Sequence, residues 1–173
     1  TSMGAARVNF NTDTNPFSDS LKIFLIPEFD NLSQRQVKKI FEDSHGKIWI
    51  GTDSGLVYQN MNEVIYLTAE RGLGDNDIFS ITEDTDGNIW CGTHSGYSKV
   101  ILDGNREIIS IESKAAMVSG KENPVRAILC DEDGKIYMGI PYLAILQKSD
   151  TSRFGYIEEE SFLRVNGINA NSI

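Results

Sequence analysis

A glycine-turn motif that returns three times is the sequence feature that most restricts the fold of this chain. In each copy a segment rich in β-branched residues leads to an aspartate, a glycine follows three residues later, and an aromatic strand-like segment comes next. The turn glycines are Gly46, Gly87 and Gly134, so the copies are 41 and 47 residues apart. A period of about 40 to 50 residues is typical of propeller blades.

Each copy has the composition of two strands joined by a tight turn. The turn glycine supplies a positive φ, which other residues rarely adopt. The strands Ile48–Ile50 and Ile89–Cys91 are apolar at every position. This lack of alternation predicts that both of their faces are covered. A glycine follows the aromatic segment at the same position of each copy, and these residues are Gly51, Gly92 and Gly139. Because glycine has no side chain, it allows a close approach or a bulge there.

Two further strands are expected in each repeat. Gly55 and Gly96 mark a second turn, and Leu56–Gln59 and Glu63–Leu67 have strand-like composition. Four strands per repeat match a propeller blade, and one blade cannot bury both faces without stacked neighbours. The sequence therefore predicts an all-β fold of four-stranded antiparallel blades, as an incomplete fragment of a larger propeller.

The repeat also divides the chain. We expect an N-terminal segment with added residues and a partial blade, two regular blades, a degenerate blade and the start of a further, truncated blade, at residues 1–19, 20–62, 63–107, 108–150 and 151–173. The final residues 166–173 repeat the phase of 71–78 and stop before the next turn. Residues 11–19 and 113–123 are expected to be loops, because they show no periodicity.

Charge and composition exclude some partners. The chain has 25 acidic and 16 basic residues, a net charge of −9, which argues against a nucleic-acid partner. Its apolar runs are far shorter than the roughly 20 residues of a membrane-spanning helix. Membrane association is therefore expected only through other parts of a longer protein. Cys91 and Cys130 occupy different repeat positions, so both are predicted to be buried free thiols.

Two strings of residues carry a family resemblance. Residues 42–56 read Glu-Asp-Ser-His-Gly-Lys-Ile-Trp-Ile-Gly-Thr-Asp-Ser-Gly-Leu, and residues 83–96 read Glu-Asp-Thr-Asp-Gly-Asn-Ile-Trp-Cys-Gly-Thr-His-Ser-Gly. Both closely resemble the two-component-regulator propeller repeat, which characterises extracytoplasmic sensor regions of bacterial hybrid two-component histidine kinases. The resemblance covers roughly residues 20–173.

The resemblance implies a function and partners. It implies a ligand-sensing or scaffold segment of a periplasmic propeller sensor that responds to carbohydrate, with the histidine kinase elsewhere in the full-length protein. No catalytic activity is then expected from this segment itself. The implied partners are an oligosaccharide, the remaining propeller blades and a homodimer partner.

Site residues do not follow from the resemblance, because the ligand-contacting loops differ among members of the family. We therefore assign no catalytic, cofactor-binding or metal-binding residue, expect no cofactor, and leave the ligand-binding residues unknown. The segment Asp84–Asn88 lacks calcium-loop spacing, since its glycine comes too early, and is predicted to be a hairpin turn. His45 and His94 are predicted to lie in surface loops.

The aromatic residues leave alternatives open. Trp49, Trp90 and Tyr137 share a repeat position, so they are predicted to pack between blades, with sugar stacking as the alternative. The tyrosines outside that position could line a ligand face; they are Tyr97, Tyr142 and Tyr156. The third copy has tyrosine in place of tryptophan, so its blade is expected to be distorted.

Two other functions stay open at this point. Propellers also host lyases and glycosidases, and this chain could be a fragment of such an enzyme. That function would need His94 paired with a carboxylate at the propeller centre. The blades could also be a passive scaffold within a larger sensor.

Overall fold

The computed structural model describes residues 6–9, 22–25, 36–60, 63–118, 121–140, 143–148 and 156–163. Within this part of the chain the regular structure consists of strands and one short 3-10 helix, η2 (Ala69–Arg71). No helix among these residues is long and apolar enough to cross a membrane.

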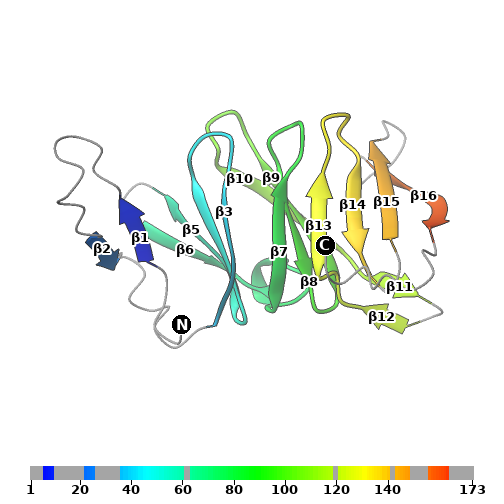
Figure 1. The fold of residues 1–173 in the computed structure, drawn as a ribbon, viewed down its shortest axis with the longest axis horizontal. Helices are drawn as coiled ribbons and strands as arrows, with labels where there is room; N and C mark the ends of the chain where they lie inside the picture. The colour runs from blue at the N-terminus through cyan, green and yellow to red at the C-terminus, as the bar shows by residue number, and fades with distance from the viewer. Residues whose placement is uncertain are drawn as a thin grey trace, which may run out of the picture.

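Three four-stranded antiparallel sheets form the body of the molecule (Figure 1), and in each the strands lie in sequence order. Blade 1 contains β3 (Val37–Glu42), β4 (Ile48–Thr52), β5 (Gly55–Asn60) and β6 (Glu63–Leu67). Blade 2 contains β7 (Ile78–Glu83), β8 (Ile89–Thr93), β9 (Gly96–Leu102) and β10 (Ile108–Lys114). Blade 3 contains β13 (Ala127–Cys130), β14 (Ile136–Gly139), β15 (Leu143–Lys148) and β16 (Tyr156–Leu163). The predicted fold class is confirmed.

The sheets end later in the sequence than the expected segments do. Strand β6 pairs with β5 and is the last strand of blade 1, although the boundary expected after residue 62 placed it in the next segment. Strand β10 likewise pairs with β9 and completes blade 2, although the boundary expected after residue 107 placed it in the next segment. Strand β16, expected in a further blade, pairs with β15. The turn motif fixes the repeat phase, but it does not say whether an outer strand joins the sheet before or after it.

The connection between blades 2 and 3 holds a hairpin that the sequence did not predict. Part of the expected loop 113–123 forms the end of β10 and the paired strands β11 (Ala116–Val118) and β12 (Lys121–Asn123). Three-residue strands are too short to show a periodic pattern. Near the N-terminus, β1 (Ala6–Asn9) and β2 (Lys22–Leu25) form a two-stranded sheet. The expected loop 11–19 lies outside the described residues.

Blades stack through continuous apolar layers, and their first strands β3, β7 and β13 lie side by side (Figure 1). Trp49 of blade 1 packs in one cluster with Ile81 and Cys91 of blade 2. Trp90 of blade 2 packs in the next cluster with Met138 of blade 3. Both tryptophans are fully buried, so their predicted role between blades is confirmed. Burial of each large apolar side chain stabilises the stack by roughly 2 to 3 kcal/mol.

A glycine two residues after each tryptophan, within β4 and β8, permits this close stacking. A Cβ on Gly92 would lie 2.2 Å from the Val125 carbonyl oxygen, and one on Gly51 would lie 2.8 Å from Cγ2 of Ile78. Real Cβ atoms do not approach other atoms so closely, so any side chain here would force neighbouring blades apart. The predicted close approach is confirmed.

One repeat position shows which faces the stack covers. Ile81 and Ile128 are 3% and 9% exposed, whereas the equivalent Ile40 of blade 1 is 51% exposed. On the opposite side, Leu129 of blade 3 is 57% exposed. The described stack therefore presents apolar side chains on both outer sides.

Candidate functional site

The aspartates that open the hairpin turns hold those turns together. Oδ1 of Asp43 accepts backbone N–H bonds from His45 at 3.0 Å and Lys47 at 2.9 Å. Oδ1 of Asp84 accepts the equivalent bonds from Asp86 at 3.0 Å and Asn88 at 2.9 Å. These carboxylates therefore serve as turn acceptors, in agreement with the predicted hairpin turn.

The second oxygen of each turn aspartate binds the aromatic residue six positions later. The indole Nε1–H groups of Trp49 and Trp90 donate to Oδ2 of Asp43 and Asp84 at 3.0 and 2.9 Å. In blade 3, the Tyr137 hydroxyl donates to Asp131 at 2.9 Å. Blade 3 thus keeps both its four-stranded sheet and this bond, and the expected distortion is wrong in these two respects.

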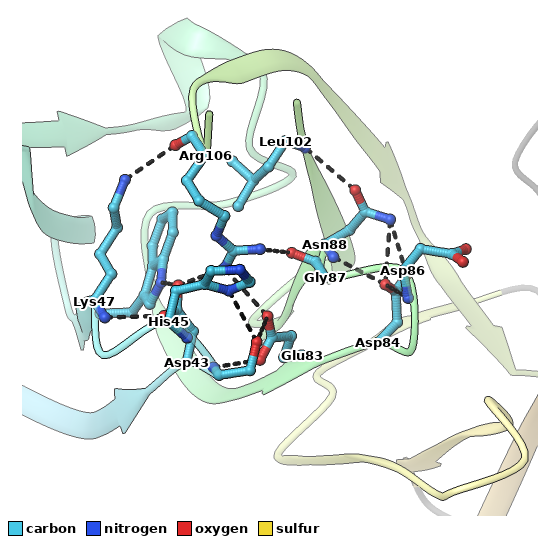
Figure 2. A network of polar contacts seen from close by, with 12 residues as sticks. Asp43, His45, Lys47, Glu83, Asp84, Asp86, Gly87, Asn88, Leu102 and Arg106 are labelled. Atoms are coloured by element: carbon cyan, nitrogen blue, oxygen red, sulfur yellow. Dashed lines mark hydrogen bonds and ion pairs between the residues drawn. The ribbon is translucent and has the colours of Figure 1, made fainter. Parts of the chain in front are cut away.

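Arg106 joins the turns of two blades (Figure 2). It lies in the β9–β10 turn of blade 2, and its Nη2 contacts Oδ2 of Asp43 in blade 1 and, at 3.2 Å, Oε1 of Glu83. Its Nη1 donates to the Gly87 carbonyl oxygen. The Asp43 side chain is 0% and the Arg106 side chain 12% exposed. We call this set of side chains the turn-face network.

Further hydrogen bonds extend the turn-face network between the same blades. The backbone N–H and the hydroxyl of Ser44 donate to the two Glu83 carboxylate oxygens at 2.7 and 2.9 Å. The Lys47 ammonium donates to the Arg106 carbonyl oxygen at 3.0 Å. Blades 1 and 2 are therefore linked on this face by charge as well as by apolar packing.

The turn-face network sets the protonation of Asp43. Burial alone would raise the pKa of this carboxyl, but the hydrogen bonds from Trp49 and Arg106 and from the backbone N–H groups of Lys47 and His45 outweigh it. The pKa of Asp43 is therefore held below its usual value. Burial also lowers the pKa of the Lys47 ammonium, against the opposing effect of Glu107 and Asp43.

Arg106 has a backbone conformation that favours glycine. Its φ is 65°, and its N–H donates to the Asp103 carbonyl at 2.9 Å. Oδ1 of Asp103 accepts bonds from the backbone N–H groups of Asn105 and Glu107, as Oδ1 of the other turn aspartates does. The left-handed conformation costs a residue with a Cβ about 1 kcal/mol. The sequence did not reveal this turn because Arg106, rather than glycine, stands three residues after its aspartate.

An open hollow of about 490 Å³ lies beside the turn-face network and is lined by turn residues of all three blades. Its lining is polar and rich in carboxylates, and includes Glu83, Asp86, Asp103, Arg106, Cys130 and Asp131. The exposed imidazole of His45 also lines the hollow. The hollow therefore offers several carboxylates and one imidazole ring, with no tryptophan, tyrosine or phenylalanine among its described lining residues.

The two histidines lie apart and in turns. His45 is exposed, and its Nδ1 is 3.0 Å from the Ser44 hydroxyl. His94 is exposed in the β8–β9 turn, with its ring centroid 6.3 Å from that of Phe79. Their predicted surface-loop positions are confirmed. Among the described residues, His94 contacts an aromatic ring rather than the carboxylate that the enzyme alternative requires.

The structure bears on two further residue predictions. Tyr97, one of the tyrosines that could line a ligand face, is 4% exposed and stacks on Trp90, with ring centroids 6.0 Å apart, so it belongs to the core between blades. The side chains of Tyr142 and Tyr156 lie outside the described residues. Cys91 and Cys130 are free thiols, as predicted, but only Cys91 is fully buried. Burial raises the pKa of both thiols.

The sequence analysis did not predict a cationic cluster at the beginning of the first strands of the blades, β3, β7 and β13. The turn-face network lies at the other end of these strands. Phe79 of β7 has the Lys38 ammonium 4.5 Å and the Arg126 guanidinium 4.7 Å from its ring centroid. Lys38 is also paired with Asp77. These three side chains, with His94, form what we call the Phe79 cluster. The available signal was a shared repeat position whose residue type changes from blade to blade.

Comparison with known proteins agrees with the repeat assignment. The family described as two component regulator propeller matches residues 31–54 and 72–95, which cover the first two turn motifs. A comparison with curated proteins finds no match. The chain therefore carries propeller repeats of this family.

Solved structures share the fold at low sequence identity. The extracellular domain of BT3049 from B. thetaiotaomicron, assigned as a hybrid two-component system, has 23% identity and a TM-score of 0.55 over 79% of this chain. That of BT4673 from the same organism, assigned as a one-component system, has 17% identity and a TM-score of 0.58 over 83%. PorZ, a surface component of the type-IX secretion system of Porphyromonas gingivalis, has 15% and 0.53 over 77%. The chain spans only 19%, 18% and 22% of these structures.

Proposed function

We propose that this chain, whose repeats are those of the two component regulator propeller family, is a ligand-sensing segment of the periplasmic part of a hybrid two-component histidine kinase. The observation that carries the proposal is the family match on two consecutive blades. Its ligand would be an oligosaccharide, and the kinase would lie elsewhere in the full-length protein.

The stacking of the blades supports a sensing role. The turn-face network joins Asp43 of blade 1 to Arg106 of blade 2, and apolar clusters continue into blade 3. A ligand bound by one blade can therefore bias the position of its neighbours, as sensing through domain movement requires. Further blades would cover Ile40 and Leu129, the half-exposed residues on the outer sides of the described stack.

A calorimetric screen of neutral and acidic oligosaccharides tests binding by this chain and by the complete periplasmic part. Autophosphorylation of the full-length protein in membrane vesicles, with and without the ligand found, tests signalling. Saturable binding by the chain and a ligand-dependent change in phosphorylation are expected. Binding by the complete periplasmic part alone would make this segment a scaffold. Continuing turnover of the oligosaccharide would instead favour the enzyme alternative.

A further inference from the structure

One repeat position changes its residue type from blade to blade, although the positions that form the fold do not. Lys38, Phe79 and Arg126 stand at this position, directly after Val37, Ile78 and Val125. By contrast, three other positions keep their residue type in all three blades. They are the turn aspartate, the turn glycine and the glycine two residues after the aromatic residue. The fold therefore does not dictate this position, which leaves it available for binding.

The three side chains at this position meet in space. Strand β7 packs against both β3 and β13, so Lys38 and Arg126 reach the Phe79 ring from neighbouring blades. Their charged groups lie 4.5 and 4.7 Å from the ring centroid, close enough for cation–π attraction. Two long and otherwise flexible basic side chains are thus held in place by one aromatic ring. Less conformational freedom is then lost when a ligand binds them.

The charges in the Phe79 cluster are not balanced. Lys38 is paired with Asp77, whereas the exposed Arg126 has no carboxylate partner among the described residues. The cluster therefore keeps one guanidinium charge that no described carboxylate neutralises, in a chain of 25 acidic and 16 basic residues. A guanidinium offers two parallel N–H donors that match the two oxygens of a carboxylate.

We propose that Arg126 and Lys38 bind the carboxylate of an acidic sugar, with Phe79 as the positioning residue that holds both cations. The proposal depends on the proposed function only for the ligand being an oligosaccharide. Arg126 would donate two parallel N–H bonds to the carboxylate, and Lys38 would add charge from the neighbouring blade.

Calorimetric titration of the 173-residue chain with trisaccharides of galacturonic and mannuronic acid tests this site. The fully methyl-esterified trisaccharides keep the sugar but lack the charge. The test variants are Arg126→Gln and Phe79→Leu, and Lys121→Gln is the matched control, because Lys121 is an exposed cation in the same connection between blades. We expect at least one acid trisaccharide to bind both the chain and the control, with about tenfold weaker binding by Arg126→Gln.

The remaining expected results separate positioning from charge. Phe79→Leu should weaken binding by a few-fold while Lys121→Gln does not, and each ester should bind at least about tenfold more weakly than its acid. Unchanged thermal midpoints would show that the variants fold.

Equal binding of acid and ester, or of Arg126→Gln and Lys121→Gln, would overturn the inference while leaving saccharide sensing intact. Binding of acetate as tightly as the trisaccharide would also overturn it. If neither acid trisaccharide binds, the inference is also overturned. The wider oligosaccharide screen would then decide the proposed function separately.

Discussion

The Tyr137 hydroxyl donates to Oδ2 of Asp131 at 2.9 Å, and this bond replaces in blade 3 the indole bond of the other two blades. Phenol and indole differ in shape, yet each carries one donor at the far end of a flat apolar ring. The repeat therefore requires an aromatic ring with a polar hydrogen at this position rather than tryptophan itself.

Removal of that donor should weaken blade 3. Tyr137→Phe leaves Asp131 without this partner, and we expect a loss of about 1 kcal/mol in the free energy of unfolding, as for a single hydrogen bond. Urea denaturation measures the loss. In a double-mutant cycle with Asp131→Asn the two losses should not add. Additive losses would show that the bond contributes nothing.

Arg106 should contribute far more to the free energy of unfolding than an exposed cation such as Lys121 does. Arg106→Gln leaves the Asp43 carboxylate, which is 0% exposed, without its charged partner. Breaking one side of a buried ion pair typically costs about 3 kcal/mol or more. We expect a loss of this order in urea denaturation, against a change below about 0.5 kcal/mol for the exposed control Lys121→Gln. Equal losses for the two variants would contradict the role of the turn-face network.

Acid should destabilise the protein partly through Asp43. Because the pKa of Asp43 is lower in the folded chain, its ionised form stabilises the fold fully above the unfolded pKa of about 4. This contribution is lost as the pH falls from that value through the lower pKa of the folded chain. We expect a thermal midpoint that falls steeply below about pH 4. Asp43→Asn should be less stable at neutral pH and lose less on acidification. A variant whose midpoint falls as steeply as that of the wild type would disprove the assignment.

Two glycines allow a matched test of blade spacing. A Cβ on Gly92 would lie 2.2 Å from a backbone oxygen, whereas one on Gly104 would meet nothing within 4 Å. We expect Gly92→Ala to cost about 1 to 3 kcal/mol and Gly104→Ala to be close to neutral. Thermal unfolding of both variants provides the comparison. A stable Gly92→Ala protein would mean that the blades move apart easily.

The fold could be predicted from sequence because its main determinants lie within one repeat. The Asp-x-x-Gly turn, the apolar strand and the close-approach glycine each act over a few residues, so Gly46 and Gly92 could be interpreted without a structure. The boundaries between blades could not, because the pairing of β6 with β5 rather than with β7 depends on the sheet as a whole.

The site residues escaped prediction for a related reason. Arg106 contacts Asp43 across 63 residues of sequence, and its turn lacks the glycine that marked the others. Lys38 and Arg126 are unremarkable surface residues until blade stacking brings both to the ring of Phe79. The core position of Tyr97 also escaped prediction, because its different repeat position hid its stacking on Trp90.

The turn-face network connects unlike parts of neighbouring sheets. Asp43 lies in the turn between the first two strands of blade 1, and Arg106 lies in the turn between the last two strands of blade 2. Apolar layers hold the two sheets together by packing that has no preferred direction. The ion pair runs diagonally from the first strands of one sheet to the last strands of the next. It therefore opposes shear, the sliding of one sheet along the other.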